Sequence, residues 1–427
     1  MQTRQPKQQI VDQAVAYYAL SHPVKRRSFF RGLHTRTVFS FISGAIALSV
    51  SNITLPQSSR IETLADNNVQ ATSSGCEVVI FPTIGIAETS WEVCWATVPD
   101  HGLIISSARF SVFSSRVSIQ VLGDTRLSEL LVPYHSGEPR FFDISIDSES
   151  PSSLTLSSTD CLPSVGGILI GSDQVCLQVR DRGLAWTDNS SPRRVRRGEE
   201  LVLWGMLDGG NYRYILEWSF QDDGAIIARA GATGPKLGGE DDHRGHMHMF
   251  SWRINIDLNG PDGDSVFTTR HVEPCSGNPL KACDSSTLIS TERGVVWNPR
   301  EFTTLEIFDE TLRNCSVPSR PTSYELIPWR SGTARHFATD PTFNVDERYT
   351  QKDFWVTRFD GAELLAKKLP VYVNGEDVRE KDVVIWYTGG LHHKEMMKDE
   401  DRQTVPVKWV GFELVPQNLF CKTPLYP

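Results

Sequence analysis

The sequence predicts an all-β protein built from large packed sheets, and three observations support this fold class. Short stretches rich in β-branched and aromatic residues recur from residue 76 onward and are divided by turn residues. The 427 residues include 31 Gly and 24 Pro, which is typical of a chain with many turns and few long helices. No helical heptads or internal repeats stand out. This length suits two or three ordinary domains, or one large β domain with an appendage.

The first 75 residues differ in composition from the rest. A basic segment at 25–31 precedes a moderately apolar run at 38–50, an order typical of an export signal. The run is shorter than the roughly 20 residues that span a membrane. The basic segment also resembles a twin-arginine signal, whereas a membrane anchor or an unstructured basic tail is the alternative. We expect an export leader over 1–52, a linker and first strand over 53–85, and the main domain over 86–427, in a periplasmic or extracellular protein.

Strands are expected in chain order after this leader. The stretches richest in strand-forming residues are 77–81, 103–113, 117–121, 201–206, 212–220 and 225–232. The turn sequence Asp222-Asp223-Gly224 predicts a hairpin between the last two of them. A further strand is expected at 413–415, near the end of the chain.

Net charge and cysteine content narrow the classes of function. The formal net charge of −9 argues against nucleic acid as the main partner and mildly favours cationic small molecules. The eight cysteines lack the paired Cys-x-x-Cys spacing of a zinc ribbon, so we expect disulfides and an oxidising compartment. Cys161 with Cys176 and Cys275 with Cys283 are candidates close in sequence, although connectivity cannot be deduced from sequence alone.

The stretch from His246 to Asp257 indicates a metal site. Its residue types alternate as in a strand, so His246 and His248 share one face and can chelate a single ion. Imidazole suits copper, zinc, iron or nickel. The alternative is that both histidines are polar residues on a solvated strand face.

A third ligand must come from elsewhere among the 11 histidines. His243 lies in an acidic, Gly-rich loop, so we expect it to be solvated. His392 and His393 follow an apolar strand that we expect to end in a turn at Gly389-Gly390. One histidine of this pair is expected to be the ligand and the other its neighbour.

Several motifs together resemble the catalytic domain of the copper-containing amine oxidases, the quinoprotein primary amine oxidases. They follow one consistent order over roughly residues 86–427: Leu130-Leu131-Val132-Pro133-Tyr134, Asn211-Tyr212, the His246/His248 pair, Asp353-Phe354-Trp355-Val356-Thr357-Arg358, Ile385-Trp386-Tyr387-Thr388 before His392-His393, and Gly411-Phe412-Glu413-Leu414-Val415-Pro416. The resemblance implies a large antiparallel β-sandwich, the supersandwich of that family, and a homodimer. We expect a short form of the family with the catalytic domain only, because the small α/β domains that commonly precede it are missing.

The resemblance also implies which residues hold the cofactors. His246, His248 and His393 are the expected copper(II) ligands. Tyr212, with Asn211 beside it in the cofactor-binding motif, is expected to be converted by copper and O2 to topaquinone.

Further roles follow from the same resemblance. Asp143 is the expected catalytic base, and Tyr134 is expected to hydrogen-bond O4 of the quinone. A peripheral cation site, often filled by calcium, prefers oxygen ligands. The residues implied for it are Asn255, Asp257 and Asp382, with the backbone carbonyls of Ile256 and Val383.

These roles imply oxidative deamination, in which a primary amine, water and O2 give an aldehyde, ammonia and hydrogen peroxide. The amine forms a Schiff base with the quinone of Tyr212, and Asp143 removes a proton from the α-carbon. Asp208 and Arg213 depart from the family pattern, and Arg213 is expected to place a cation next to the cofactor. The alternatives are a copper-binding or scaffold protein on the same fold without the quinone, and another three-histidine metal enzyme such as a zinc hydrolase.

Overall fold

The structure is a computed structural model that describes residues 69–71, 76–82, 89–113, 117–134, 140–145, 151–234, 245–272, 275, 280–314, 316–319, 321–332, 345–393 and 405–421. Contacts divide the chain into Met1–Thr54 and Leu55–Pro427, and every described residue belongs to the second unit. The expected export leader and His243 lie outside the described residues, and the expected domain boundaries stay predictions. Within the described part of the chain, no helix is long and apolar enough to cross a membrane.

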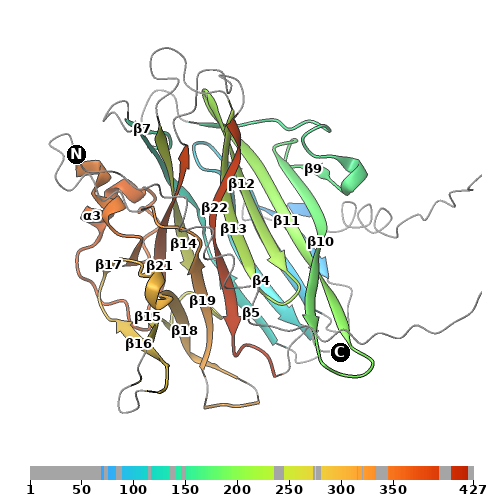
Figure 1. Ribbon diagram of the computed structural model, residues 1–427. Helices are drawn as coiled ribbons and strands as arrows, with labels where there is room; N and C mark the ends of the chain where they lie inside the picture. The colour runs from blue at the N-terminus through green and yellow to red at the C-terminus, as the bar shows by residue number, and fades with distance from the viewer. Residues whose placement is uncertain are drawn as a thin grey trace, which may run out of the picture. The chain divides into compact units, whose positions relative to one another are not determined.

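Two large antiparallel sheets of eleven strands each form the second unit (Figure 1). The first sheet runs in the order β1 (Val69–Ala71), β2 (Glu77–Pro82), β3 (Thr89–Val98), β4 (Gly102–Val112), β5 (Val117–Leu122), β14 (His246–Ile256), β21 (Val383–His393), β20 (Phe354–Arg358) and β17 (Arg293–Val295), with β6 (Arg126–Pro133) paired to β14 and β7 (Arg140–Phe142) paired to β6.

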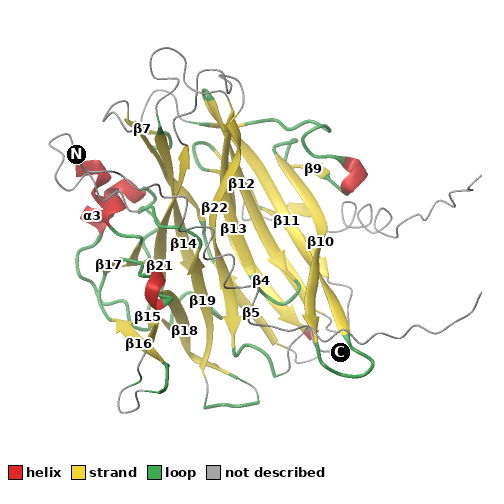
Figure 2. Ribbon diagram, viewed as in Figure 1, coloured by secondary structure: helices red, strands yellow, loops and turns green. Residues whose placement is uncertain are grey.

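The second sheet runs in the order β16 (Cys283–Ile289), β15 (Asp264–Val272), β18 (Thr304–Arg313), β19 (Pro321–Pro328), β22 (Val405–Gln417), β13 (Ile226–Gly234), β12 (Tyr212–Gln221), β11 (Val195–Gly209), β10 (Val175–Thr187) and β9 (Ile168–Ile170), with β8 (Ser152–Ser153) paired to β11. Figure 2 shows that helix is confined to short segments outside the sheets. These are η2 (Pro163–Val165), η3 (Pro299–Glu301), η5 (Val345–Gln351), η6 (Ala366–Lys368) and α3 (Leu369–Tyr372).

The apolar core lies between the facing sides of the two sheets. Trp91 of β3 and Phe110 of β4, in the first sheet, pack against Phe220 of β12 in the second. The ring centroid of Trp91 lies 4.8 Å from that of Phe110 and 5.3 Å from that of Phe220. The Trp91 indole N–H donates to the Gln221 carbonyl at 2.7 Å, so this buried polar group is satisfied. These contacts fix the distance between residues that the two sheets contribute to one site.

Strand β14 is buried on both faces. Phe250 and Trp252 face the second sheet and belong to the main core. Met249, on the opposite face, packs in a smaller cluster with Tyr349 and Trp386. A strand with apolar residues on both faces is typical of the covered centre of a sheet. The histidines at the start of β14 are therefore excluded from solvent.

The predicted all-β sandwich is confirmed, and the expected strands coincide with β2, β4, β5, part of β11, β12, β13 and part of β22. The hairpin at Asp222-Asp223-Gly224 forms, with Gly224 at a φ of 88°. The expected turn at Gly389-Gly390 is wrong, because β21 continues through both glycines to His393. A Cβ at Gly389 would lie 2.6 Å from the Tyr387 hydroxyl and 2.7 Å from the Val410 side chain, so glycine is needed there for space rather than for a turn.

Disulfides join Cys76 to Cys94, Cys161 to Cys176 and Cys275 to Cys283, and Cys421 is also disulfide-bonded. The last two of these three pairs confirm the candidates that were close in sequence. The pairing of Cys76 with Cys94 had no sequence signal, because it depends on the register of β2 and β3, where Cys94 lies opposite Val78. These disulfides are consistent with an extracytoplasmic protein.

Candidate active site

Three histidines meet at the inner face of the first sheet. The antiparallel register of β14 and β21 places His393 directly opposite His246, and His248 lies two residues further along the same face. All three are buried, with exposed fractions of 3% or less, so the alternative of a solvated strand face is wrong. His393 Nδ1 lies 3.2 Å from His248 Nε2 and 3.3 Å from His246 Nε2. His392, the neighbour of His393, is partly exposed and is not part of this cluster.

The three histidines fit a metal ion. Among the described residues, they are the one group of His, Cys, Asp or Glu side chains whose ligand atoms all lie within 4.8 Å of one another. Imidazole nitrogens bound at about 2.0 Å in tetrahedral geometry are about 3.3 Å apart, close to the separations found here. Burial, with His246 and His393 nearby, lowers the pKa of His248 well below its usual range. The imidazole is therefore neutral, which is the form that binds a metal.

Tyr212 reaches this cluster from the other sheet. It begins β12 directly after a two-residue turn, Gly210-Asn211, in which Gly210 takes a φ of 77° as the first central position of a type II′ turn requires. Its buried hydroxyl lies 2.9 Å from His246 Nε2 and 3.3 Å from His393 Nδ1. Burial raises the pKa of Tyr212 above its usual range, so the phenol is protonated in the absence of a metal.

Asp143 is linked to Tyr212 by Tyr214, a residue that the sequence did not single out. The backbone N–H of Asp143, just after β7, donates to the Leu130 carbonyl at 2.9 Å. The Tyr214 hydroxyl donates to Asp143 Oδ2 at 2.8 Å, and the Tyr214 ring stacks on Tyr212 with centroids 6.2 Å apart. Burial raises the pKa of Asp143 to about 6, although the bond from Tyr214 favours its ionised form. The two-residue period of β12, which puts Tyr212 and Tyr214 on one face, could have identified Tyr214.

Tyr134 closes the cluster on another side. It follows β6 and forms an isolated antiparallel bridge with His246. Its ring stacks on the His246 ring with centroids 4.6 Å apart and planes 24° apart, and it is buried. The structure thus gathers Tyr134, Tyr212 and Asp143 around the histidines, with Asn211 in the turn before Tyr212.

Arg213 does not place its charge on the Tyr212 ring. Tyr212 and Arg213 are consecutive in β12 and point to opposite faces. The Arg213 Nη1 donates to Asp208 Oδ1 at 2.5 Å and to the Gly210 carbonyl at 2.7 Å. Asp208 is the cross-strand partner of Arg213, so the two departures from the family pattern form one ion pair. The Arg213 Nη1 also donates to the Tyr212 carbonyl at 3.1 Å, so the expected cation lies next to residue 212 but on its backbone side.

A second group of polar residues lies at the far end of β14. Asn255 and Asp257 are buried, and Asn255 Oδ1, Asp257 Oδ1 and Asp382 Oδ1 have no hydrogen-bond partner. Asp264, which the sequence did not indicate, is fully buried, and the Leu258 backbone N–H is a weak partner of its carboxylate. Burial raises the pKa of Asp257 to about 6, and burial with neighbouring carboxylates raises that of Asp382 to about 7 and that of Asp264 to about 10.

This group fits a cation by its charge and its buried oxygens. Unpartnered buried carboxylate oxygens are costly, and a bound cation removes that cost. Asp257 and Asp382 lie close enough to Asp264 to raise its pKa by charge repulsion. The cation site stays a proposal.

The two-sheet fold and the buried cluster of three histidines and a tyrosine identify a β protein whose centre could hold a metal ion. Residues 243–426 match the family described as "Copper amine oxidase, enzyme domain". This segment of the chain therefore belongs to the copper amine oxidase enzyme-domain family.

Similar proteins are amine oxidases along most of the chain. A "Primary amine oxidase" of Arthrobacter sp. (strain P1) is 25% identical over 390 residues, which cover 78% of this chain and 58% of that protein. A "Primary amine oxidase" of Klebsiella aerogenes is 28% identical over 272 residues, which cover 53% of this chain and 35% of that protein. The solved copper-containing benzylamine oxidase of Hansenula polymorpha shares the fold with a TM-score of 0.63 at 19% identity, over 81% of this chain and 62% of that one. The chain spans little more than half the length of the Arthrobacter relative.

Proposed function

We propose that the chain is a copper- and topaquinone-dependent primary amine oxidase, which converts a primary amine, water and O2 to an aldehyde, ammonia and hydrogen peroxide. The observation that carries this proposal is the position of the Tyr212 hydroxyl, within 3.3 Å of nitrogens on both His246 and His393. A tyrosine in a metal centre is the residue that this chemistry needs, because it is both the precursor of the cofactor and the neighbour of the ion. Bound copper(II) and the quinone derived from Tyr212 would supply the electron sink and the route to O2 that ordinary side chains lack.

Asp143 is proposed as the base that accepts the α-proton of the amine. A pKa of about 6 lets the carboxylate be ionised at neutral pH and still bind the proton in the course of turnover. Tyr214 holds Oδ2, which leaves Oδ1 for the substrate. The stack of Tyr214 on Tyr212 and the hydrogen bond from Tyr214 to Asp143 support this role, because together they hold the carboxylate close to the tyrosine that is the proposed cofactor precursor.

Tyr134 is proposed to orient the cofactor by a hydrogen bond to O4 of the quinone, and its stack on His246 supports this role by fixing the ring. Asn211 is proposed to belong to the same cofactor site, since it forms the turn that sets the start of β12. Asn255, Asp257 and Asp382 are proposed to hold calcium, and the unpartnered oxygens of these residues support this.

The test is conversion of Tyr212 itself. Purified protein is loaded with copper in air, and the peptide that contains Tyr212 is analysed by mass spectrometry and by reaction with phenylhydrazine. We expect a modified Tyr212 and peroxide release with primary amines. Tyr212→Phe should bind copper and release no peroxide. Tyr324→Phe is the matched control, because Tyr324 is equally buried and donates to the Gly224 carbonyl away from the centre. Unmodified Tyr212 in copper-loaded protein would refute the proposal.

A second candidate is a metal protein without the quinone, either a copper-binding scaffold or a three-histidine zinc enzyme. The observation that favours it is the three-histidine cluster itself, which fits a metal ion whether or not Tyr212 is modified. Metal analysis and the mass of the Tyr212 peptide separate the two candidates. Bound zinc with an unmodified tyrosine would support the second.

Export and dimer formation complete the proposal. The disulfides support export to the periplasm or the extracellular space. A homodimer is proposed from family membership alone. Sedimentation of the purified protein at several concentrations tests it, and a monomer throughout would contradict it.

A further inference from the structure

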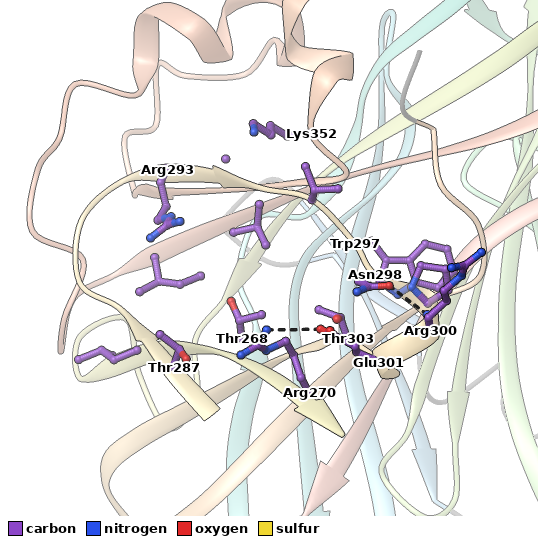
Figure 3. A pocket seen from close by; sticks show the side chains of 16 residues that line it. Thr268, Arg270, Thr287, Arg293, Trp297, Asn298, Arg300, Glu301, Thr303 and Lys352 are labelled. Carbon is purple, nitrogen blue, oxygen red and sulfur yellow. Dashed lines mark hydrogen bonds and ion pairs between the residues drawn. The ribbon is translucent and has the colours of Figure 1, made fainter. Parts of the chain in front are cut away.

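A cavity of about 830 Å³ lies outside the candidate active site, and no residue of that site lines it. It is formed by β15, β16, β17 and η3, with Lys352 from the segment after η5 (Figure 3). In the strand order given above, β16 is the edge of the second sheet and β17 is the edge of the first. The cavity therefore occupies the place where the chain passes from one sheet to the other.

The cavity is strongly cationic. Its lining contains Arg270, Arg293, Arg300 and Lys352 but one carboxylate, Glu301, an excess of three positive charges in a chain whose net charge is −9. Arg270 Nη1 lies 3.4 Å from Glu301 Oε2, so these two charges offset each other. No ion pair between described residues involves the other three cations. Arg293 and Arg300 are exposed, so solvent screens part of their mutual repulsion, and an anion placed among the three cations would be attracted by all of them.

Part of the remaining wall is apolar and fixed in place. Ile289 is buried, Val295 and Trp297 pack against the main core, and the Trp297 backbone N–H donates to Asp353 Oδ2 at 2.8 Å. Figure 3 shows Arg293 and Lys352 at one end of the cavity and Trp297 at the other. An occupant can therefore contact the indole and reach a cation at the same time.

A buried hydroxyl in the same lining lacks a partner. Thr303 is 2% exposed, and its Oγ1 is buried with no hydrogen-bond partner. Burial of a hydroxyl without a hydrogen bond is unfavourable, so Thr303 marks an incompletely satisfied wall of the cavity.

We propose that this cavity binds an amphipathic organic anion, in which an aromatic or acyl body carries a carboxylate or a phosphate group. The body packs on Ile289, Val295 and Trp297, and the anionic group bonds to Arg293, Arg300 or Lys352. The volume lies within the range of pockets for small organic ligands, about 300–1,000 Å³. A protonated primary amine is repelled by the same charges, so this is a second site, distinct from the one for the proposed substrate.

The test is direct binding by isothermal titration calorimetry with 2-naphthoate as the probe, at low ionic strength because salt screens such contacts. We expect the wild-type chain to bind 2-naphthoate more tightly than the neutral analogue 2-naphthalenemethanol and more tightly than inorganic phosphate. The double variant Arg293→Gln/Lys352→Gln should weaken binding by about tenfold or more, since a hydrogen bond to a charged group is at stake. Quenching of Trp297 fluorescence, absent in Trp297→Phe, places the probe in this cavity.

The matched control is Arg193→Gln/Lys368→Gln, which removes the same two charges from exposed positions that do not line the cavity. It should keep the wild-type affinity. Arg300→Gln is a second variant should the first double variant fold poorly. Absence of 2-naphthoate binding, equal affinity for the neutral analogue, or an equal loss in the control would overturn the proposal. Because binding is measured without turnover, the result is independent of whether the chain oxidises amines.

Discussion

The bond from the Tyr214 hydroxyl to Asp143 gives a quantitative prediction for the proposed reaction. With a pKa of about 6, Asp143 is ionised in about 10% of molecules at pH 5 and about 90% at pH 7. The rate constant for reduction of the protein by saturating amine, measured without O2, should therefore rise about tenfold between these values. Tyr214→Phe removes a hydrogen bond of 2.8 Å to the carboxylate. Such a bond contributes about 1.5–3 kcal/mol. In Tyr214→Phe, the midpoint of the rise in rate constant with pH should therefore move upward by about one to two pH units.

The assay needs a measure of how much protein carries the cofactor, because Tyr214 stacks on Tyr212, the proposed cofactor precursor, and its substitution could change the extent of conversion. Phenylhydrazine titration gives the fraction of converted protein, and stopped-flow absorbance gives the rate constant per converted molecule between pH 5 and 9. In the control Tyr324→Phe, the midpoint of the rise in rate constant should stay near pH 6. Suppose that Tyr214→Phe forms the cofactor normally and that the midpoint of its pH dependence equals that of the wild type. Tyr214 then does not affect the pKa of Asp143, and the assignment of the base is wrong.

Three further predictions concern metal binding and stability. His248→Ala should reduce copper to well below one ion per chain by metal analysis, whereas His392→Ala, next to the centre but outside it, should keep full copper. Asp264→Asn should raise the melting temperature of calcium-free protein at pH 8, since it removes a fully buried acid, and should abolish any further rise when calcium is added. Glu129 is buried with a pKa raised from 4.5 to about 7, so its contribution to stability is full below pH 4.5 and is lost as the pH rises through 7. That loss amounts to about 3 kcal/mol, and Glu129→Gln should show a correspondingly smaller fall in the free energy of unfolding over this range in urea titrations.

The strands and the histidine pair could be predicted because their signals are local. Alternation with period two defines β12, β13 and β14, and the same period puts His246 and His248 on one face. A glycine is a weaker signal, since it marks either a turn or a close approach. Gly389 is an example of the second, because the Tyr387 hydroxyl and Val410 occupy the space of its Cβ.

Residues that depend on pairing between distant segments could not be predicted from local pattern. Asp264 is a functional candidate only because the fold buries it near Asp257 and Asp382. In the sequence, Asp208 and Arg213 are two separate differences from the amine oxidase pattern. Only the register of the hairpin shows that they are cross-strand partners. Most residues that line the cationic cavity lie between Thr287 and Thr303, but Arg270 and Lys352 are brought to it only by the fold, so the stretch alone did not indicate the cavity.

The centre of the molecule draws its groups from two separately hydrogen-bonded layers. Tyr212 belongs to the second sheet and the three histidines to the first, and the hydroxyl contacts join residues 34 and 181 positions apart in the chain. Strand pairing within each sheet and packing between the sheets must both be complete before these groups meet. The three histidines that would hold an ion all lie on paired strands of the first sheet, so the ion site needs that sheet alone, whereas packing of the second sheet is what brings Tyr212 to it.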